Sequence, residues 1–370
     1  MARPQRSELS RQNEPRNASP NVSRRAMLKT TMAVIAGSFA QSALSATAST
    51  ADPRIRGPFL ILTTPFTASG AVDFDVLTDE ARFVDRCGCA GMVWPQSGDS
   101  VDLLSAEEKM HGMEVLAQVA RNLRTALCLG VQGRNTDEML AFAQHAEKLA
   151  PAAMISRPPD SGKTENDLRE YWRALASVVK RPVILQTTGG VLYQGPVPSV
   201  ALLVELAQQY PHFGYVKEEA RPVIARIRSL VAARPPIRRV FSARGGLGWL
   251  YEMRLGTEGL ITERAVVADL LTRIWEWQQT GSDPAALRDA YARFLLMTNL
   301  GDHLPGGGLR GFQLYLWKKR GVFKTMVSRQ YGPNQTIPAK PIYSELRLNT
   351  QEIAEIEYRF EAVKPYLNQP

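Results

Sequence analysis

The stretch His212-Phe213-Gly214-Tyr215-Val216-Lys217-Glu218-Glu219-Ala220 joins a short apolar run to a lysine and two acids. The run is rich in aromatic and β-branched residues and follows a proline, which predicts a short buried strand over Phe213–Val216, with Lys217 at its carboxyl end. Burial disfavours a charged ammonium, so a lysine in an apolar pocket can become a free amine, which is a nucleophile for ketones. The alternative is a strand-end lysine in an ion pair with Glu218 or Glu219.

Seven further apolar runs alternate with helix-like segments along the chain, and the connections between them are short. This alternation indicates parallel strands with crossover helices. Eight such units between Gly57 and about Thr280 fit a closed (β/α)8 TIM barrel, an α/β fold whose active site lies at the carboxyl ends of the strands. The predicted strands are Gly57–Pro65, Ala90–Trp94, Ala126–Val131, Ala152–Ser156, Pro182–Gln186, Phe213–Val216, Arg239–Ser242 and Gly259–Thr262.

The carboxyl-terminal part of the chain shows mainly helical patterns. Pro284–Leu300, Leu309–Met326 and Gln351–Leu367 have helical spacing, and the proline-rich segment Gly332–Pro341 interrupts them. We therefore expect a barrel over residues 49–282 and a helical extension over residues 283–370 that packs on it.

Residues 1–48 are predicted to be an export signal. The segment Ser23-Arg24-Arg25-Ala26-Met27-Leu28-Lys29 matches the twin-arginine pattern, with methionine where phenylalanine is usual. A modest apolar stretch, Met32–Ala40, follows, and Ala46-Thr47-Ala48 fits a cleavage site. Twin-arginine signals are addresses read by a receptor and do not anchor a protein. We expect the mature chain to start near Ser49 and to be exported already folded to the periplasm or beyond; the alternative is a disordered basic tail.

Composition excludes several classes of partner. The net charge of +9 comes largely from residues 1–48, which hold seven of the 45 basic residues and two of the 36 acidic ones, so the balance elsewhere gives little support to nucleic-acid binding. No stretch reaches the roughly 18 apolar residues of a membrane span, so no membrane anchor is expected. Four scattered histidines and three cysteines form no metal-ligand pattern, and the cysteines are expected to be small buried residues.

With the lysine on the sixth strand, the chain resembles the dihydrodipicolinate synthase / N-acetylneuraminate lyase family of Schiff-base aldolases. The resemblance extends from Gly57 to about Leu367 and rests on landmarks in the family's order. These are Leu62-Thr63-Thr64-Pro65-Phe66 with Gly70 and Asp73, the loop Gly91–Asp99, Leu104–Glu108, Gly214-Tyr215-Val216-Lys217-Glu218, and Gly256–Thr262.

The resemblance implies roles for individual residues. Lys217 would form an imine with a 2-oxo acid such as pyruvate or a sugar-acid derivative, without a cofactor or a metal. Ser97 keeps one hydroxyl of the family's carboxylate-binding loop, Gln96 replaces the other, and Gly98 keeps a close backbone approach. Thr64 and Thr262, in two further landmarks, are also expected to bind substrate. Because family members commonly form tetramers, a homo-oligomer (a tetramer or a dimer) is expected.

The sequence departs from the family pattern at the fifth strand. The family has a tyrosine there as a proton shuttle beside the lysine, and this chain has Gln186, which can form hydrogen bonds but cannot transfer protons as a phenol does. The loop that follows, Thr187–Pro196, is altered as well, and its Tyr193 is the candidate to fold back and replace the phenol; otherwise Tyr193 is only a loop aromatic. Asp160 and Lys163, after the fourth strand, are further candidates. Arg244, after the seventh strand, would pair with a distal carboxylate or be a solvated arginine.

Two functions follow from these observations. The first is a Schiff-base lyase, aldolase or hydratase of 2-oxo acids, with Lys217 as nucleophile and Gln186 or Tyr193 orienting a water or hydroxyl for proton transfer. The second is a barrel that binds an acidic metabolite without turnover or with altered chemistry, which the missing fifth-strand tyrosine favours.

Overall fold

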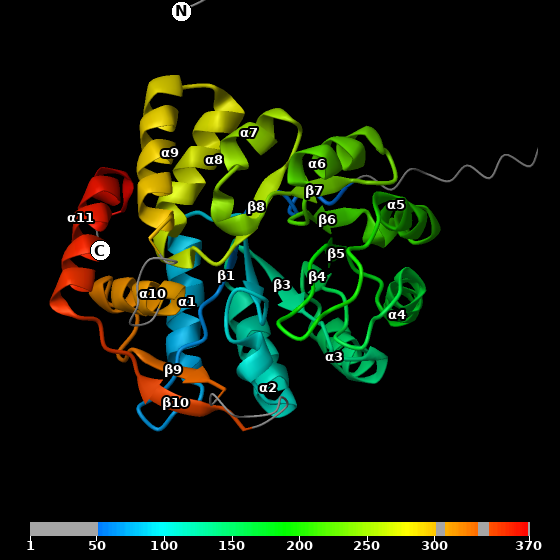
Figure 1. The fold of residues 1–370 in the computed structure, drawn as a ribbon, viewed down its shortest axis with the longest axis horizontal. Helices are drawn as coiled ribbons and strands as arrows, with labels where there is room; N and C mark the ends of the chain where they lie inside the picture. The colour runs from blue at the N-terminus through cyan, green and yellow to red at the C-terminus, as the bar shows by residue number, and fades with distance from the viewer. Residues whose placement is uncertain (1–50, 301–307, 332–339, 369–370) are drawn as a thin grey trace, which may run out of the picture. The chain divides into compact units, whose positions relative to one another are not determined.

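The computed structural model describes residues 51–300, 308–331 and 340–368. Eight parallel strands form the centre of this part of the chain, in the order β7-β6-β5-β4-β3-β2-β1-β8. Ser242, directly after β7, pairs with Leu260 of β8 and closes the barrel (Figure 1). The strands are β1 Gly57–Ile61, β2 Gly91–Trp94, β3 Ala126–Gly130, β4 Ala153–Ser156, β5 Val183–Gln186, β6 Tyr215–Lys217, β7 Arg239–Phe241 and β8 Gly259–Thr262.

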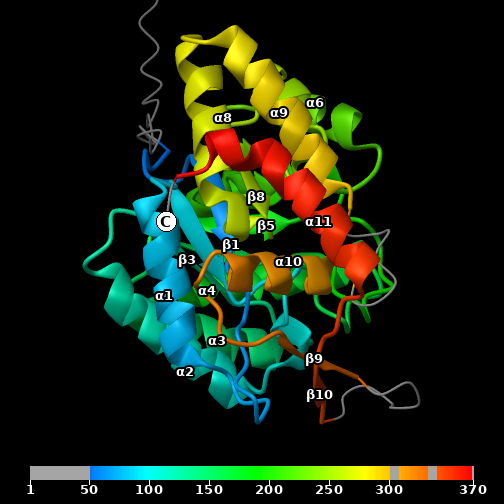
Figure 2. The ribbon, with the colours of Figure 1, turned by 90° about the vertical axis from the view of Figure 1, so that its left-hand side faces the viewer.

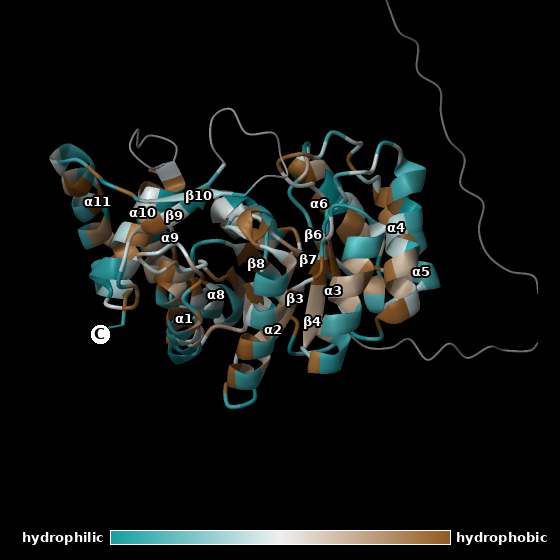
Figure 3. Cartoon of the chain, turned by 90° about the horizontal axis from the view of Figure 1, so that it is seen from below, coloured by the Kyte–Doolittle hydropathy of each residue, from teal (hydrophilic) through white to brown (hydrophobic). Residues whose placement is uncertain are grey.

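Helices follow the strands and surround them, with hydrophilic and hydrophobic residues on different faces (Figure 3). Local signals fix several helix starts; at α2, for example, Ser105 and Glu108 form the capping box that their spacing predicts. The barrel helices are α1 Phe74–Arg86, α2 Ala106–Ala120, α3 Thr136–Leu149, α4 Glu165–Val178, α5 Val200–Gln209, α6 Val223–Ala232, α7 Trp249–Arg254 and α8 Ala268–Thr280.

Side chains alternate between two cores along each strand, as the two-residue period of a strand requires. One core fills the barrel and contains Phe59, Ile184 and Tyr215. The other lies between strands and helices and contains their neighbours Leu60 and Val216. The position of a residue within its strand therefore decides whether its side chain points into the barrel.

The carboxyl-terminal extension packs on the barrel. Its helices are α9 Pro284–Thr298, α10 Gly308–Lys319 and α11 Thr350–Val363; α9 lies on α8, and α11 lies on α9 (Figure 2). In α10, the Trp317 indole N–H donates to the Thr63 hydroxyl at 3.0 Å. The described residues of the barrel and of the extension belong to one compact unit.

Three details differ from the expectations. Strand β6 begins at Tyr215 and includes Lys217, because Pro211–Phe213 forms a 3-10 turn. The helix expected to run to Met326 ends at Lys319, shortly before Gly321, whose φ of 73° is left-handed. An antiparallel pair follows, β9 Val327–Gln330 with β10 Ile342–Glu345, where no strands were expected.

The structure confirms the expectation for the cysteines. The three cysteines are free and buried. In the described ranges every helix is too short or too polar to cross a membrane, and no group of three or more His, Cys, Asp or Glu side chains is placed to hold a metal ion. The predicted export signal, residues 1–48, lies outside the described residues.

Candidate active site

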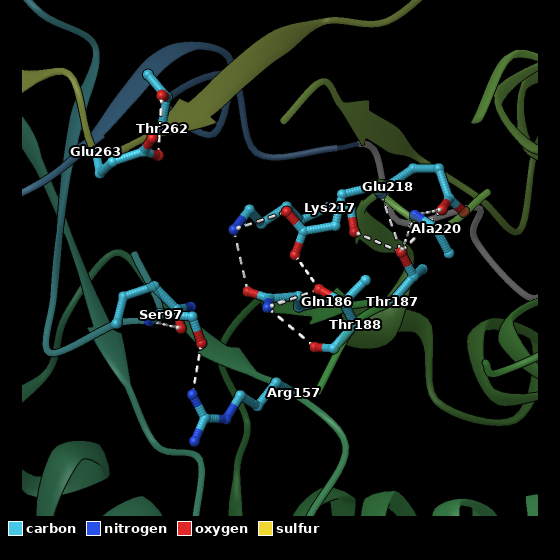
Figure 4. A network of polar contacts seen from close by, with 12 residues as sticks. Ser97, Arg157, Gln186, Thr187, Thr188, Lys217, Glu218, Ala220, Thr262 and Glu263 are labelled. Carbon is cyan, nitrogen blue, oxygen red and sulfur yellow. Dashed lines mark hydrogen bonds and ion pairs between the residues drawn. The ribbon is translucent and has the colours of Figure 1, made fainter. Parts of the chain in front are cut away.

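Lys217 points into the barrel at the carboxyl end of β6. Tyr215 belongs to the barrel interior and Val216 to the outer core, so the next residue faces inward again. The lysine is 4% exposed, and its Nζ donates to Gln186 Oε1 at 3.1 Å (Figure 4). Gln186 ends β5 and faces inward because it is two residues beyond Ile184 of the interior core. Neighbouring strands thus bring two predicted site residues into contact.

The two acids after Lys217 lie on opposite sides of the strand. Glu219 Oε2 is 3.6 Å from Lys217 Nζ. Glu218 instead is fully buried on the outer side, where it accepts hydrogen bonds from Arg226 Nε at 3.0 Å and from the Thr187 hydroxyl at 2.8 Å. Of the two ion pairs considered from the sequence, the structure therefore contains the one with Glu219.

A cavity of ≈ 380 Å³ opens above Lys217. It is lined by the ends of strands β5 to β8, the loop after β2 and the end of α9, so side chains far apart in the sequence meet there. Five of its side chains belong to acidic or basic residues. They are Lys217, Glu219, Arg244, Glu263 and Arg264.

The loop after β2 brings Ser97 and Gly98 to this cavity. Gly98 has a φ of 94°, which favours glycine, and a Cβ there would lie 3.3 Å from the Glu263 Cβ. Gln96 does not line the cavity: it is fully buried, and its Oε1 accepts the Ser97 backbone N–H at 2.6 Å. Gln96 therefore shapes the loop instead of presenting its amide to a ligand.

Arg157 binds Ser97 and so supports the loop after β2. It follows β4 and is 4% exposed. Its Nη2 donates to Asp102. Its Nη1 donates to the Ser97 hydroxyl at 2.6 Å (Figure 4). Because the Ser97 oxygen accepts this bond, its own hydroxyl proton is free to be donated elsewhere.

Thr64 and Thr262 do not line the cavity. Thr64 lies in the loop after β1, and Thr262 is at an outward-facing position of β8. The Thr64 hydroxyl accepts from Trp94 Nε1 at 3.0 Å and donates to Asp99. Thr262, which follows the inward-facing Ile261, donates to Glu263 Oε2 at 3.2 Å. The expectation that these threonines contact a ligand is corrected on this ground.

Tyr193 does not fold back over Lys217. Its hydroxyl donates to the Pro196 carbonyl oxygen at 2.5 Å within its own loop, and burial raises its pKa to about 12. Neither Tyr193 nor Asp160 lines the cavity, and Lys163 is exposed. The loop Thr187–Pro196 therefore does not place the Tyr193 phenol beside Lys217.

Arg244 follows β7, and it is one of the residues that line the cavity. It is exposed, and its φ of 54° is uncommon for a residue other than glycine. This backbone conformation begins the turn Arg244–Gly246 after β7. The guanidinium is thus available at the mouth of the cavity.

Sequence reasoning missed Glu219, Glu263 and Arg157 as members of the site. One signal could have found all three: each lies two residues beyond an inward-facing strand position, namely Lys217, Ile261 and Ile155. The two-residue period alone places them at the barrel mouth.

A larger hollow of ≈ 890 Å³ lies elsewhere, bordered by the start of α2 and by β9 and β10. It shares no lining residue with the Lys217 cavity. Since it contains neither the buried lysine nor Gln186, the smaller cavity is the candidate for chemistry.

The chain is similar to known proteins both in sequence and in structure. The model of the dihydrodipicolinate synthetase family matches residues 54–291. A 4-hydroxy-tetrahydrodipicolinate synthase from Rhizobium meliloti (strain 1021) is 27% identical over 203 residues, which is 52% of this chain and 68% of that protein. A probable 2-dehydro-3-deoxy-D-pentonate aldolase from Escherichia coli (strain K12) is 25% identical over 210 residues, covering 56% of this chain and 68% of that protein.

Solved structures share the fold over most of the chain. A catalytic lysine mutant of the Ruminococcus gnavus sialic acid aldolase has a TM-score of 0.72 at 16% identity, covering 85% of this chain and 98% of that one. A prophage protein of the dihydrodipicolinic acid synthase family from E. coli K12, in complex with pyruvate, has a TM-score of 0.68 at 19% identity, covering 84% and 99%. Since the family model spans well over half of the sequence, this chain belongs to the dihydrodipicolinate synthetase family.

Proposed function

We propose that this protein is a Schiff-base-forming lyase or aldolase, or a hydratase, that acts on a 2-oxo acid, with Lys217 as the imine-forming nucleophile. The observation that carries the proposal is the buried Lys217 amine, 4% exposed, beneath a cavity of ≈ 380 Å³ at the carboxyl end of the barrel. Membership of the family supports the same class of chemistry.

In this proposal the Lys217 nitrogen attacks the C2 carbonyl carbon and a C–N bond forms. The carbonyl oxygen takes up protons and leaves as water, which produces an iminium ion. The iminium nitrogen then accepts the electron pair of the bond beyond C3 as that bond breaks; bond formation uses the same steps in reverse. Ser97 donates its hydroxyl proton to the C1 carboxylate, and Arg244 pairs with a distal anionic group.

Borohydride trapping with pyruvate tests the proposal. Reduction of the imine should give an intact mass larger by one reduced pyruvate residue, with the label on Lys217 in a peptide digest. Lys109 is the matched control within the chain, because it is also buried and burial lowers its pKa. Absence of an adduct, or a Lys217→Ala variant that is still labelled, would overturn the proposal.

Gln186 supports a second candidate, a barrel that binds an acidic metabolite without turnover. Its amide accepts a hydrogen bond from Lys217 but cannot carry a proton. A thermal-shift screen separates the two: stabilisation by 2-oxo acids with neither a trapped adduct nor a product would favour binding alone.

A further inference from the structure

The chemistry proposed for the Lys217 cavity needs a side chain that carries protons. Imine formation and carbon–carbon bond cleavage both need a group that accepts a proton and returns it. Gln186 contacts the nitrogen but has no such capacity, and the Tyr193 hydroxyl is engaged within its own loop. Another side chain within reach of Lys217 Nζ must therefore carry the protons.

Glu219 is placed for this task. Its side chain is 15% exposed, lines the cavity, and has Oε2 at 3.6 Å from Lys217 Nζ. This is longer than a hydrogen bond, but catalytic contacts are often long without substrate and tighten when it binds. Gln186 and Glu219 both contact the nitrogen, and of these two side chains only Glu219 is able to exchange a proton.

The surroundings hold Glu219 in one orientation. The Thr188 hydroxyl donates to Glu219 Oε1, and the Thr187 hydroxyl accepts the Glu219 backbone N–H at 3.0 Å. Gln186 Nε2 donates to the Thr188 carbonyl oxygen at 3.0 Å, which turns Gln186 Oε1 toward Lys217. These contacts leave the second Glu219 oxygen facing the lysine.

We propose that Glu219 is the general acid and base of this site, in place of a fifth-strand phenol, and this inference rests on the proposed function. The carboxylate first takes a proton from the Lys217 ammonium. The free amine then attacks C2, and one proton of the amine moves to the carbonyl oxygen, which becomes a hydroxyl. The carboxylic acid returns that proton to the departing hydroxyl, which leaves as water when the C=N bond forms. The carboxylate next removes a hydrogen from C3, or from the hydroxyl group beyond C3 when the carbon–carbon bond breaks, and the electron pair moves to the iminium nitrogen. Thr188 is a positioning residue.

The remaining charges around Glu219 do not take over this role. Arg264 donates to Glu263 Oε1 at 2.7 Å and to the Thr298 hydroxyl at 2.6 Å, so these two cavity charges neutralise each other. Arg244 is a permanent cation at the rim. Glu263 therefore serves as a matched control, since it is a carboxylate of the same cavity whose contacts are with Arg264 and Thr262 and not with Lys217 Nζ.

Exchange of the pyruvate methyl hydrogens in heavy water, followed by NMR, tests the inference. Glu219→Gln keeps the size of the side chain and its contact with Thr188, but an amide cannot take up and return a proton. The rate of exchange should therefore fall about a hundredfold or more. Glu219→Asp keeps a carboxylate and should exchange at least tenfold faster than Glu219→Gln, whereas Glu263→Gln should lose less than tenfold. Added formate should partly restore exchange to Glu219→Ala.

The outcomes separate this inference from the proposed function. If the wild-type protein neither traps nor exchanges pyruvate, the proposed function fails and the inference falls with it. If the wild-type protein does both, and Glu219→Gln exchanges within about twofold of it, the role of Glu219 is overturned while that of Lys217 stands. Equal rates for Glu219→Gln and Glu219→Asp, with no effect of formate, would also overturn it.

Discussion

At the scale of single residues, the two-residue period of a strand decides which side chains meet in the cavity. Lys217 and Glu219 face the barrel mouth, whereas Glu218 between them is buried on the outer side. The same period turns Thr262 of β8 outward. A sequence motif identifies the residue types that follow a strand. The register of the strand decides which of their side chains face the cavity.

Ser97 is expected to contribute to carboxylate binding. Its hydroxyl accepts from Arg157 and lines the cavity, so Ser97→Ala removes one donor to an anion. A hydrogen bond to a charged group is worth about 1.5–3 kcal/mol, so the pyruvate concentration for half-maximal trapping should rise about tenfold or more. Ser69→Ala, an exposed hydroxyl outside the cavity, is the control; an unchanged concentration dependence for Ser97→Ala would contradict the assignment.

Arg226 is expected to stabilise the fold through the buried Glu218 carboxylate. Arg226→Met leaves this charge without its ion-pair partner, which typically costs about 3–5 kcal/mol in the free energy of unfolding near neutral pH. Burial raises the pKa of Glu218, so its folded-state pKa lies above the unfolded value. Between the unfolded-state and the folded-state pKa of Glu218, the folded protein binds more protons than the unfolded protein. Stability therefore falls as the pH rises through this range.

Urea unfolding between pH 4 and pH 8, which is roughly the range where a carboxylate with a raised pKa titrates, measures this effect. The fall in stability with rising pH should be larger in Arg226→Met than in the wild-type protein. Arg82→Met removes an exposed pair with Asp79 and should change stability by less than about 1 kcal/mol. An Arg226→Met variant as stable as the wild-type protein at neutral pH would contradict the prediction.

At the scale of secondary-structure elements, helix α10 connects the extension to the barrel mouth. Leu309 lines the cavity, and Arg310 bonds to Asp99 Oδ1 at 2.5 Å and to the Thr64 carbonyl oxygen at 2.6 Å. Trp317, fully buried, packs edge-on against Phe83 of α1 with ring centroids 5.1 Å apart. The extension therefore completes the wall of the site.

Trp317→Ala tests the connection of α10 to the barrel. Truncation of a buried tryptophan costs about 3–5 kcal/mol, because apolar contacts are lost and a cavity remains. Tyr358 of α11 is 69% exposed, so Tyr358→Ala should stay within about 0.5 kcal/mol of the wild-type protein. Equilibrium unfolding in urea measures both variants, and similar stabilities would show that α10 does not secure the barrel.

At the scale of the whole molecule, the closed barrel is one unit with its extension, and two features of the chain stay predictions. One is a homo-oligomer, a tetramer or a dimer, which light scattering on the purified protein would measure. The other is export, because the twin-arginine segment lies outside the described residues. We propose that the protein reaches the periplasm or the outside of the cell.

Replacing Arg24 and Arg25 with lysines should block export, since the receptor reads the arginine pair and not the charge alone. Cell fractionation would find the wild-type protein in the periplasm or the medium and the variant inside the cell. Lysine replacement of Arg3 and Arg6, outside the motif, is the matched control. Wild-type protein that stays in the cell would contradict the prediction.

The (β/α)8 fold and the position of Lys217 could be predicted from the sequence, because apolar runs, caps and turns are local signals that repeat eight times along the chain. The buried cysteines and the contact between Gln186 and Lys217, on neighbouring strand ends, follow from the same signals. The strand pair β9–β10 could not be predicted, because the sequence of neither segment indicates that the two pair with each other.

Sequence by itself determined the family, the barrel and the one amine on which the proposed chemistry depends. Only the tertiary structure decided that Tyr193 stays in its own loop, that Arg157 donates to the Ser97 hydroxyl, and that the Thr188 hydroxyl binds Glu219 beside Lys217. The physical reason is that side-chain direction and hydrogen-bond partners depend on strand register and on loop packing, which arise from contacts between distant parts of the chain.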